Sequence, residues 1–319
     1  MRHKKILFLI FVVCLIETVA AFLPTVFKEW YFYYAAYRVL YFVILAYAWN
    51  MLGGYCGFMN FGVGAFAGVS AYASAYLLKI GVSDFLTTLL FGVIVSTLLG
   101  FVLAFCTVRV TGSYFSIASL ALTFILQAII LSQPELGGGG GLYIPEPAPP
   151  APYTDFREFL FVLAVGTALV ALLTSWKMET AWIGKGLLSI KDDEIAAGTL
   201  GVDVVKLKLL VVLISSAFMG FIGATLPYYV LYLEPYSTMS IEVTVTTVAS
   251  VYLGGIGNFL GPLIGGGILG TIMQTVTVTI SSELNMLVVG ILLVVLITSA
   301  PTGIMGIVKR MQGVRQSND

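Results

Sequence analysis

The chain has 319 residues, of which 59% are hydrophobic and only 10% are charged, and its formal net charge is zero. Soluble domains carry about 25% charged residues, so this composition excludes an ordinary soluble protein. The neutral balance also gives no electrostatic footprint for nucleic acid. Runs of about twenty apolar residues recur along the chain, each long enough to cross a bilayer as a helix, whereas the strands of a β-barrel would alternate apolar and polar residues. The composition predicts an all-α polytopic membrane protein.

Hydrophobic segments follow one another along the whole chain. They span residues 6–27, 34–53, 59–79, 85–108, 113–133, 158–176, 206–231, 241–257, 259–281 and 284–307. The third, eighth and ninth are rich in glycine, so each is expected either to cross the membrane or to be re-entrant or broken. The polar connections are too short for a soluble domain. We therefore expect a single transmembrane domain over residues 1–319, with about eight to ten hydrophobic segments.

The first segment, 6–27, has two interpretations. Basic residues precede its apolar core and small residues occur near Ala20, as in a signal peptide. Its apolar run continues through Phe27, which favours an uncleaved first span. An ion-coupled mechanism needs buried ionisable groups. Glu17, within this segment, is the residue that favours such a mechanism, whereas Glu242 lies at the edge of the eighth segment.

Positive charges predict the orientation. If the N-terminus is cytoplasmic and all ten segments cross, most lysines and arginines fall on the inner side, as expected for cytoplasmic loops. Both termini and the loop at about 177–205 are then cytoplasmic. The loop at about 134–157 is external, and its glycine and proline content predicts an irregular conformation.

Patterns for catalysis, metal binding and nucleotide binding are missing from the sequence. His3 is the sole histidine, and Cys14, Cys56 and Cys106 lie far apart in apolar or glycine-rich surroundings. The glycine run 137–141 lacks the GxxxxGK[ST] spacing of a phosphate-binding loop. We therefore expect no catalytic residue, no metal and no cofactor bound by this chain, and any ATP dependence would come from another subunit.

Two glycine-rich clusters leave two interpretations open. They are GYCGFMNFGVGAFAGVSAYASAYL (54–77) and LGGIGNFLGPLIGGG (253–267). Small residues let helix backbones approach closely, so both clusters fit tight packing alone. They also fit helices that line or kink around a translocation path, and Pro262 would break or start a helix. The candidate path residues are Tyr55, Gly57, Asn60, Gly62, Gly64, Gly254, Gly255 and Gly257.

Charges gather in SIKDDEIAAGTLGVDVVKLK (189–208). Ser189 and Asp192 form an [ST]xx[DE] pattern, a variant of the capping box, which predicts a short helix with its acidic residues in the first turn. Gly198 and Gly201 are expected to weaken and end this helix, and Asp203 to cap the next one.

This short cytoplasmic helix is either an ordinary connection or a docking element for a cytoplasmic protein. Ile195, Thr199 and Val202 would share one of its faces. Ala196, Ala197 and Gly198 carry little side-chain bulk, so a partner could approach closely there.

Taken together, the motifs resemble those of branched-chain amino acid ABC importer permeases of the LivM type. Residues 184–226 resemble the family's cytoplasmic loop and the span that follows it, and residues 54–72 and 251–266 resemble its glycine-rich motifs. Further matches follow in the family's order at 112–125, 137–145 and 299–307. The resemblance covers nearly the whole chain.

The resemblance implies the transmembrane domain of an ABC importer, without enzymatic activity, in the cell (inner or plasma) membrane of a prokaryote. It implies a LivH-like second permease, two ABC ATPase subunits that hold ATP and Mg, and an external substrate-binding protein. The ATPase-coupling helix would comprise Asp192, Asp193, Glu194, Ile195, Ala196, Ala197, Gly198 and Gly201.

The sequence departs from the family pattern at Cys56, where a small residue is common, and at Asn60, where serine is frequent. Lys185 and Lys191 stand in place of the usual arginines. Transport of urea or short amides is therefore an alternative to branched-chain amino acids. An ion-coupled secondary transporter and a structural scaffold are the competing classes.

Overall fold

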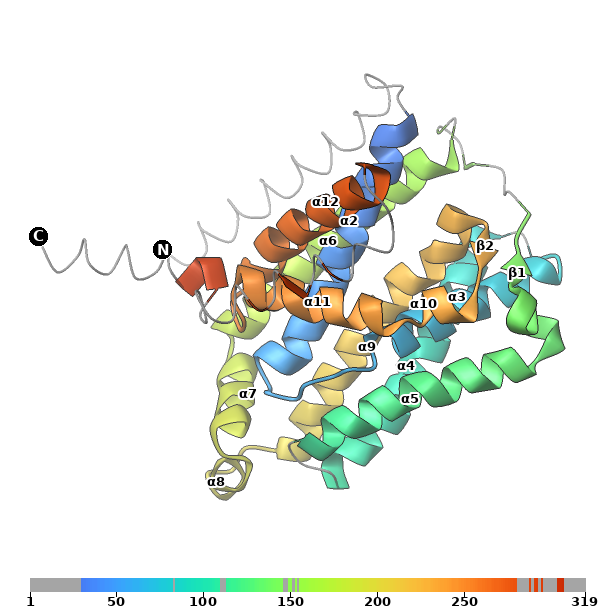
Figure 1. Ribbon diagram of the computed structural model, residues 1–319. Coiled ribbons are helices and arrows are strands. Elements are labelled where there is room, and N and C mark those ends of the chain that lie inside the picture. The colour runs from blue at the N-terminus through green and yellow to red at the C-terminus, as the bar shows by residue number, and fades with distance from the viewer. Residues whose placement is uncertain are drawn as a thin grey trace, which may run out of the picture.

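A computed structural model of the chain describes residues 30–82, 84–109, 113–145, 149–150, 153, 155–279, 287, 290–291, 294 and 303–306. Most of these residues lie in helices (Figure 1). The longer helices are α2 (Trp30–Trp49), α3 (Val63–Lys79), α4 (Phe85–Arg109), α5 (Ser113–Ser132), α6 (Phe156–Thr180), α9 (Val204–Val230) and α12 (Gly261–Thr279). The shorter ones are α7 (Trp182–Asp192), α8 (Glu194–Thr199), α10 (Pro235–Thr238) and α11 (Ile241–Gly254), with a π-helical turn, η1 (Asn50–Gly54), directly after α2.

Five helices in the described part of the chain are long and apolar enough to cross a membrane. They cover Tyr31–Gly54, Phe85–Phe105, Tyr114–Ser132, Phe156–Thr180 and Val204–Val230. The prediction of an all-α polytopic membrane protein is confirmed. The second to ninth predicted segments each contain a helix, whereas the first, with Glu17, and most of the tenth lie outside the described residues.

Two of the glycine-rich segments are shorter as helices than as apolar runs. Helix α11 has 14 residues, which at about 1.5 Å per residue gives about 21 Å, less than the hydrocarbon core of about 30 Å. Helix α3 has 17 residues and begins only at Val63, after an irregular stretch. Interruption is therefore a property of this fold, and it falls on the glycine clusters.

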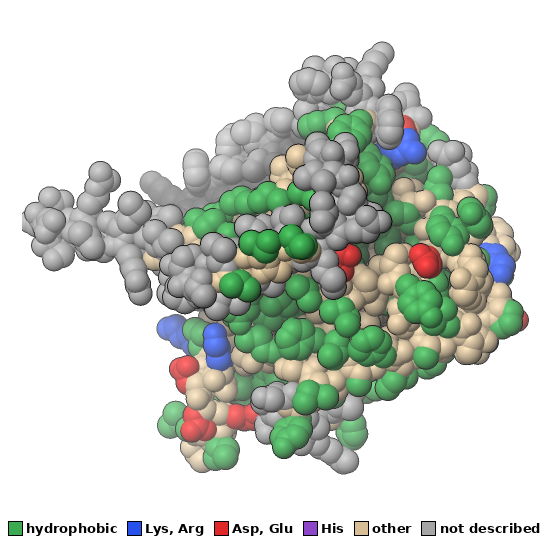
Figure 2. Space-filling view, viewed as in Figure 1, with side chains coloured by type: hydrophobic (Ala, Val, Ile, Leu, Met, Phe, Trp, Pro, Cys, Tyr) green, Lys and Arg blue, Asp and Glu red, His purple; other side chains and the backbone are tan. Residues whose placement is uncertain are grey.

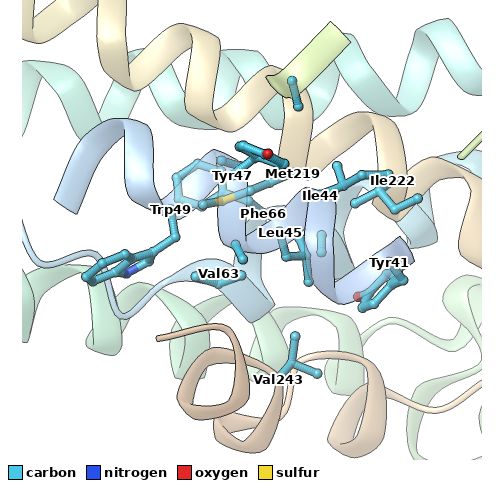
Figure 3. Packing of buried hydrophobic residues seen from close by; sticks show 14 of the residues in the cluster. Tyr41, Ile44, Leu45, Tyr47, Trp49, Val63, Phe66, Met219, Ile222 and Val243 are labelled. Atoms are coloured by element: carbon cyan, nitrogen blue, oxygen red, sulfur yellow. The ribbon is translucent and has the colours of Figure 1, made fainter. Parts of the chain in front are cut away.

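Helix α2 lies at the centre of the bundle and packs against α6, α9, α11 and α12. Figure 3 shows its buried side chains, among them Tyr41, Leu45 and Trp49, between Met219 and Ile222 of α9 and Val243 of α11. Hydrogen bonds also join α2 to α9. Tyr37 contacts Thr225 through their hydroxyls at 2.7 Å, and Ser215 Oγ donates to the Ala48 carbonyl at 2.7 Å.

Small residues bring α9 close to α3 and α4. A Cβ on Gly220 would lie 2.5 Å from Ser96 Cβ of α4, and one on Gly223 would lie 2.3 Å from the Ala67 carbonyl oxygen of α3. Ser70 Oγ donates to the Gly220 carbonyl at 2.5 Å. Hydroxyls and glycines thus allow van der Waals and hydrogen-bonded contact between backbones, which is how helices associate in lipid.

The loop at 134–157 is largely irregular but is attached to the bundle. It contains two 3₁₀ turns, Pro134–Leu136 and Gly138–Gly140, and the strand β1 (Leu142–Tyr143). Strand β1 pairs antiparallel with β2 (Tyr232–Leu233), which directly follows α9. In Figure 1 this pair lies at the opposite end of the molecule from α7 and α8.

Charged side chains are unevenly distributed over the surface. On the face shown in Figure 2, acidic and basic side chains gather at the lower left, where α7 and α8 lie, beside a broad hydrophobic area. Helices α4 and α5 carry many of the exposed large hydrophobic side chains. The α7–α8 end is therefore the polar end from which a soluble partner would approach.

Candidate coupling site and interrupted helices

Helix α8 is a short helix with well-defined ends at the edge of the bundle. The Asp193 carboxylate accepts hydrogen bonds from the backbone N–H groups of Ile195 and Ala196, both at 2.9 Å, so it is the N-cap. At the other end Gly201 has φ +87°. Its N–H donates to Gly198, and the next N–H, of Val202, donates to Ala197, the pair of bonds of a Schellman motif.

The N-terminal boundary differs from the prediction. Asp192 is the last residue of α7 and does not lie in the first turn of α8. Ser189 does not cap α8 either, because its hydroxyl donates to the Gly186 carbonyl within α7 at 2.8 Å. Both Asp192 and Asp193 can cap a helix, and the chain turns at Asp193, whose extended backbone (φ −155°, ψ 111°) separates the two helices.

Apolar side chains on and around α8 project into solvent. Ile195 is 81% exposed, Leu200 83% and Trp182, at the start of α7, 73%. A groove of about 580 Å³ lies between α7 and the start of α9 and is lined in part by Trp182, Lys185 and Lys206. This end of the molecule therefore combines exposed apolar groups with a charged rim.

The predicted contact face of α8 is partly wrong. Ala197 is only 2% exposed and belongs to the hydrophobic core of the chain, so it cannot face a partner. Ala196, Gly198 and Thr199 are exposed, as a partner surface requires. Val202 is partly buried against the core instead of sharing the exposed face with Ile195.

Glu194 connects α8 to a lysine inside the bundle. Its carboxylate lies 2.5 Å from Lys208 Nζ of α9, and the side chain of Lys208 is only 2% exposed while that of Glu194 is 32% exposed. The ammonium also lies 4.6 Å from the ring centroid of Phe58, a cation–π geometry. Sequence reasoning had assigned Lys208 to the cytoplasmic surface, and its burial was missed.

Lys191 makes a second connection, from the last turn of α7. Its ammonium donates to the Gly54 carbonyl at 2.9 Å, at the end of η1. Its aliphatic chain lies against Gly57, where a Cβ would come 2.9 Å from Lys191 Cγ. Gly57 has φ +82°, so both its backbone conformation and this close approach favour glycine.

The two glycine clusters meet inside the molecule. The side chain of Asn50, fully buried, donates to the Asn258 carbonyl at 3.2 Å and accepts from the Gly257 N–H at 2.9 Å. Glu179, near the end of α6, accepts from the Phe259 N–H at 2.8 Å. Backbone groups freed by the interruptions at 55–62 and 255–260 are thus partly satisfied by side chains, as irregular backbone within a membrane domain requires.

The candidate path residues line these two interruptions. Tyr55 is buried and its hydroxyl contacts Ser175 Oγ of α6 at 2.9 Å. Asn60 Oδ1 accepts from the Gly62 N–H at 2.8 Å, and the Gly64 N–H donates to Thr244 Oγ1 at 3.3 Å. Of the eight residues, Tyr55, Gly57, Asn60 and Gly62 lie in the first interruption and Gly255 and Gly257 in the second, whereas Gly64 lies in the first turn of α3 and Gly254 is the last residue of α11.

Tight packing accounts for several of these glycines. A Cβ on Gly254 would lie 1.8 Å from the Gly261 carbonyl oxygen, and one on Gly64 would lie 3.0 Å from that of Ser240. Helix α12 begins at Gly261 with Pro262 in its first turn, the position where proline is favoured. In this conformation these glycines allow close helix packing, the first of the two interpretations.

Outside the membrane-spanning segments, Asp203 is the N-cap of α9 and accepts from the Lys206 N–H at 3.1 Å. Its carboxylate also lies 2.7 Å from Lys206 Nζ. Hydrogen bonds from the Lys206 side chain and backbone lower the pKa of Asp203. The capping role predicted for Asp203 is confirmed.

An interrupted helical core with a capped, exposed helix at its polar end defines a polytopic α-helical membrane transport domain. The chain belongs to the family described as branched-chain amino acid transport system / permease component, whose family model matches residues 31–297. It is therefore the permease component of a transport system.

Two curated relatives are the high-affinity branched-chain amino acid transport system permease proteins LivM. That of Salmonella typhimurium LT2 is 26% identical over 289 residues, which cover 83% of this chain and 67% of the relative, and that of Escherichia coli K12 is 25% identical over the same shares. The D-allose transport system permease protein AlsC of E. coli K12 is 26% identical over 225 residues, 67% of this chain and 66% of AlsC. No solved structure matches.

Proposed function

We propose that this chain is the membrane-spanning permease subunit of an ATP-driven ABC importer for branched-chain amino acids. It would work with a LivH-like second permease, two ATPase subunits that hold ATP and Mg, and an external substrate-binding protein. The family match and the two LivM relatives support the class and the substrate. In this arrangement both termini and α8 lie on the cytoplasmic side of the cell membrane.

The observation that carries the proposal is the construction of α8. It is a six-residue helix, fixed at its N-terminus by the Asp193 carboxylate and at its C-terminus by backbone hydrogen bonds, yet Ile195 and Leu200 remain more than 80% exposed. Removing these apolar side chains from water would be favourable, and this chain does not cover them. Their exposure therefore supports a partner protein whose surface covers them. An ATPase subunit with an apolar groove and a charged rim fits this surface.

The proposed mechanism is a change between two states of the bundle. ATP binding would bring the ATPase subunits together and displace α8 with them, and the membrane helices would pass from an inward- to an outward-facing arrangement. The free energy comes from the different affinity of the ATPase subunits for the two states. The interruptions at 55–62 and 255–260, with the eight candidate path residues, are the segments proposed to open.

Reconstituted transport tests this function. The chain is co-expressed with the proposed second permease and ATPase subunits, and the assembly is placed in liposomes with the binding protein. ATP hydrolysis and uptake of labelled leucine are then measured. ATP-dependent uptake is expected. Uptake driven by an ion gradient with this chain alone would identify a secondary transporter, and normal uptake without this chain would identify a scaffold.

Gly198→Trp tests the docking role of α8 within the same assay. A Cβ on Gly198 would meet only Val204 Cγ2 at 3.9 Å, so the chain itself has room for a side chain there. The matched control is Gly139→Trp in the external loop, where a Cβ would meet nothing within 4 Å. We expect Gly198→Trp to abolish ATP-coupled uptake and Gly139→Trp to leave it intact; equal uptake by both variants would contradict docking at α8.

The substrate is tested by competition. Unlabelled leucine, urea, acetamide and D-allose are added in turn to the leucine uptake assay, the last because AlsC is described as a D-allose permease. Competition by leucine alone supports the branched-chain assignment. Uptake of urea or acetamide in place of leucine would move the chain to the alternative substrate class.

A further inference from the structure

The cytoplasmic arm formed by the end of α6, α7 and α8 reaches both interruptions through charged side chains. Glu179 accepts from the Phe259 N–H, Lys191 donates to the Gly54 carbonyl, and Glu194 holds Lys208 beneath Phe58. Three charged side chains of one surface arm thus contact the same two irregular segments. Ordinary packing of a surface loop does not need three such charged contacts.

The contact through Lys208 is the most desolvated of the three. An ammonium that is 2% exposed is stable only with a close counter-charge, and Glu194 at 2.5 Å supplies it. The ring of Phe58 covers the ammonium and packs edge-on against Phe115 of α5 at 5.4 Å. The position of Phe58, and through it the contact between the first interruption and α5, therefore depends on where Glu194 holds Lys208.

Asn50 extends the connection to the second interruption. Its amide contacts both Gly257 and Asn258, so the two irregular segments are held to each other as well as to the arm. A displacement of α8 acts directly on the Glu194–Lys208 ion pair. The hydrogen bonds made by Lys191 and Glu179 start from α7 and α6, so they respond when the arm moves as a whole. Hydrogen bonds of this kind have defined lengths, so they transmit displacement better than sliding apolar contacts.

We propose that Lys208 and Lys191 are positioning residues that connect the docking helix to the first interruption, so that the Glu194–Lys208–Phe58 stack moves residues 54–58 when α8 moves. This inference rests on the proposed function. The inference adds to the proposed function the residues that would transmit a movement of the ATPase subunit to the interior of the membrane domain. Neither lysine contacts the solute; each acts through the segment that it holds.

The test removes the ion pair without leaving a buried charge. In the double variant Glu194→Gln/Lys208→Met, apolar and neutral groups of similar size replace the pair, an exchange that proteins tolerate. The control is Asp155→Asn/Arg157→Met, which neutralises an ion pair at the opposite end of α6 (side chains 33% and 31% exposed) and keeps a capping residue. Both are measured in the reconstituted assembly for thermal stability, ATP hydrolysis, and labelled leucine taken up per ATP hydrolysed.

We expect the Glu194/Lys208 double variant to keep its melting temperature and its ATP hydrolysis but to lose about tenfold in leucine uptake per ATP, a coupling loss within the range of allosteric effects. The control is expected to keep all three. Uptake per ATP equal to that of the control, in a stable assembly, would overturn the inference while leaving ATP-driven transport by this chain in place. Absence of ATP-driven uptake in the unaltered assembly is the separate failure of the proposed function.

Lys191 provides an independent arm of the experiment if the double variant does not assemble. Lys191 is an exposed residue, and Lys191→Met removes a single hydrogen bond without leaving a buried charge. The matched control is Lys79→Met, which also removes one hydrogen bond from an exposed lysine to a backbone carbonyl, that of Glu135. Lower uptake per ATP for Lys191→Met than for Lys79→Met supports the inference, and equal values contradict it.

Discussion

The clearest energetic consequence of the structure concerns the single change Glu194→Gln. It leaves the Lys208 ammonium buried, at 2% exposure, without its carboxylate. Removing one partner of a fully buried pair costs about 3–5 kcal/mol of unfolding free energy. Glu194 is 32% exposed and Phe58 retains a cation–π contact worth about 0.5–2 kcal/mol, so the expected loss is smaller, about 2–3 kcal/mol.

Lys208→Met is expected to cost less than Glu194→Gln. The carboxylate it leaves behind can turn to water, because Glu194 lies in the first turn of the exposed helix α8. The double variant should be about as stable as Lys208→Met alone. The three free energies therefore form a double-mutant cycle with a coupling of about 2 kcal/mol, well above the 0.3–0.5 kcal/mol within which independent sites add.

The assay is reversible unfolding of the purified chain in detergent, followed by circular dichroism, for the unaltered chain, both single variants and the double variant. Additive effects, within about 0.5 kcal/mol, would refute the argument that the two charges depend on each other in the folded chain. Asp203 and Lys206 form an exposed pair. The changes in unfolding free energy caused by their single variants are therefore expected to add in the double variant.

Three further predictions follow from particular contacts. Asp193→Ala should lower the stability of α8 by about 1 kcal/mol through loss of its N-cap, seen as faster hydrogen exchange in that helix, whereas Asp193→Asn should not. Asn50→Leu should destabilise the chain by about 1–3 kcal/mol for each backbone group it leaves buried without a partner, including the Gly257 N–H, and an unchanged unfolding midpoint would count against the junction. Lys206→Met should raise the pKa of Asp203 toward 3.8, measured by carbon NMR; because the folded-state pKa is lowered, the stabilisation from this carboxylate should persist above pH 3.8 and disappear as the pH falls through the lowered value.

Much of the membrane fold follows from apolar run length and from capping residues. The predicted segment 206–231 corresponds to α9, Val204–Val230, because Asp203 is a strong N-cap immediately before a continuous apolar run. The glycine clusters, for which the sequence left both tight helix packing and an interrupted helix open, are places where helices stop. These features depend on residues close in sequence, which is why the sequence reveals them.

The boundary between α7 and α8 was harder to predict, since it depends on packing. Gly184 and Gly186 make residues 182–190 resemble a loop, yet they lie within α7. Gly184 is required there by the corner with α6, where a Cβ would come 1.5 Å from the Met178 carbonyl oxygen.

The burial of Lys208 was missed because lysines near membrane ends are usually solvated. A signal for it exists in the sequence. Lys208 precedes Val211, Ser215 and Met219 at spacings of three and four residues, and all of these are buried on one face of α9. The Glu194, Phe58 and Lys208 contact joins positions distant along the chain, and no local pattern predicts it.

Photo-crosslinking from α8 tests the central claim, that this helix is the contact with an ATPase subunit. A photoreactive phenylalanine analogue replaces Ile195, which is 81% exposed, and, as the control, Tyr143 of β1 at the opposite end of the molecule, which is 78% exposed. In the transporting assembly the account predicts an ATPase subunit crosslinked to position 195 and none to position 143. An assembly that imports solute yet gives no ATPase crosslink from position 195 would contradict it.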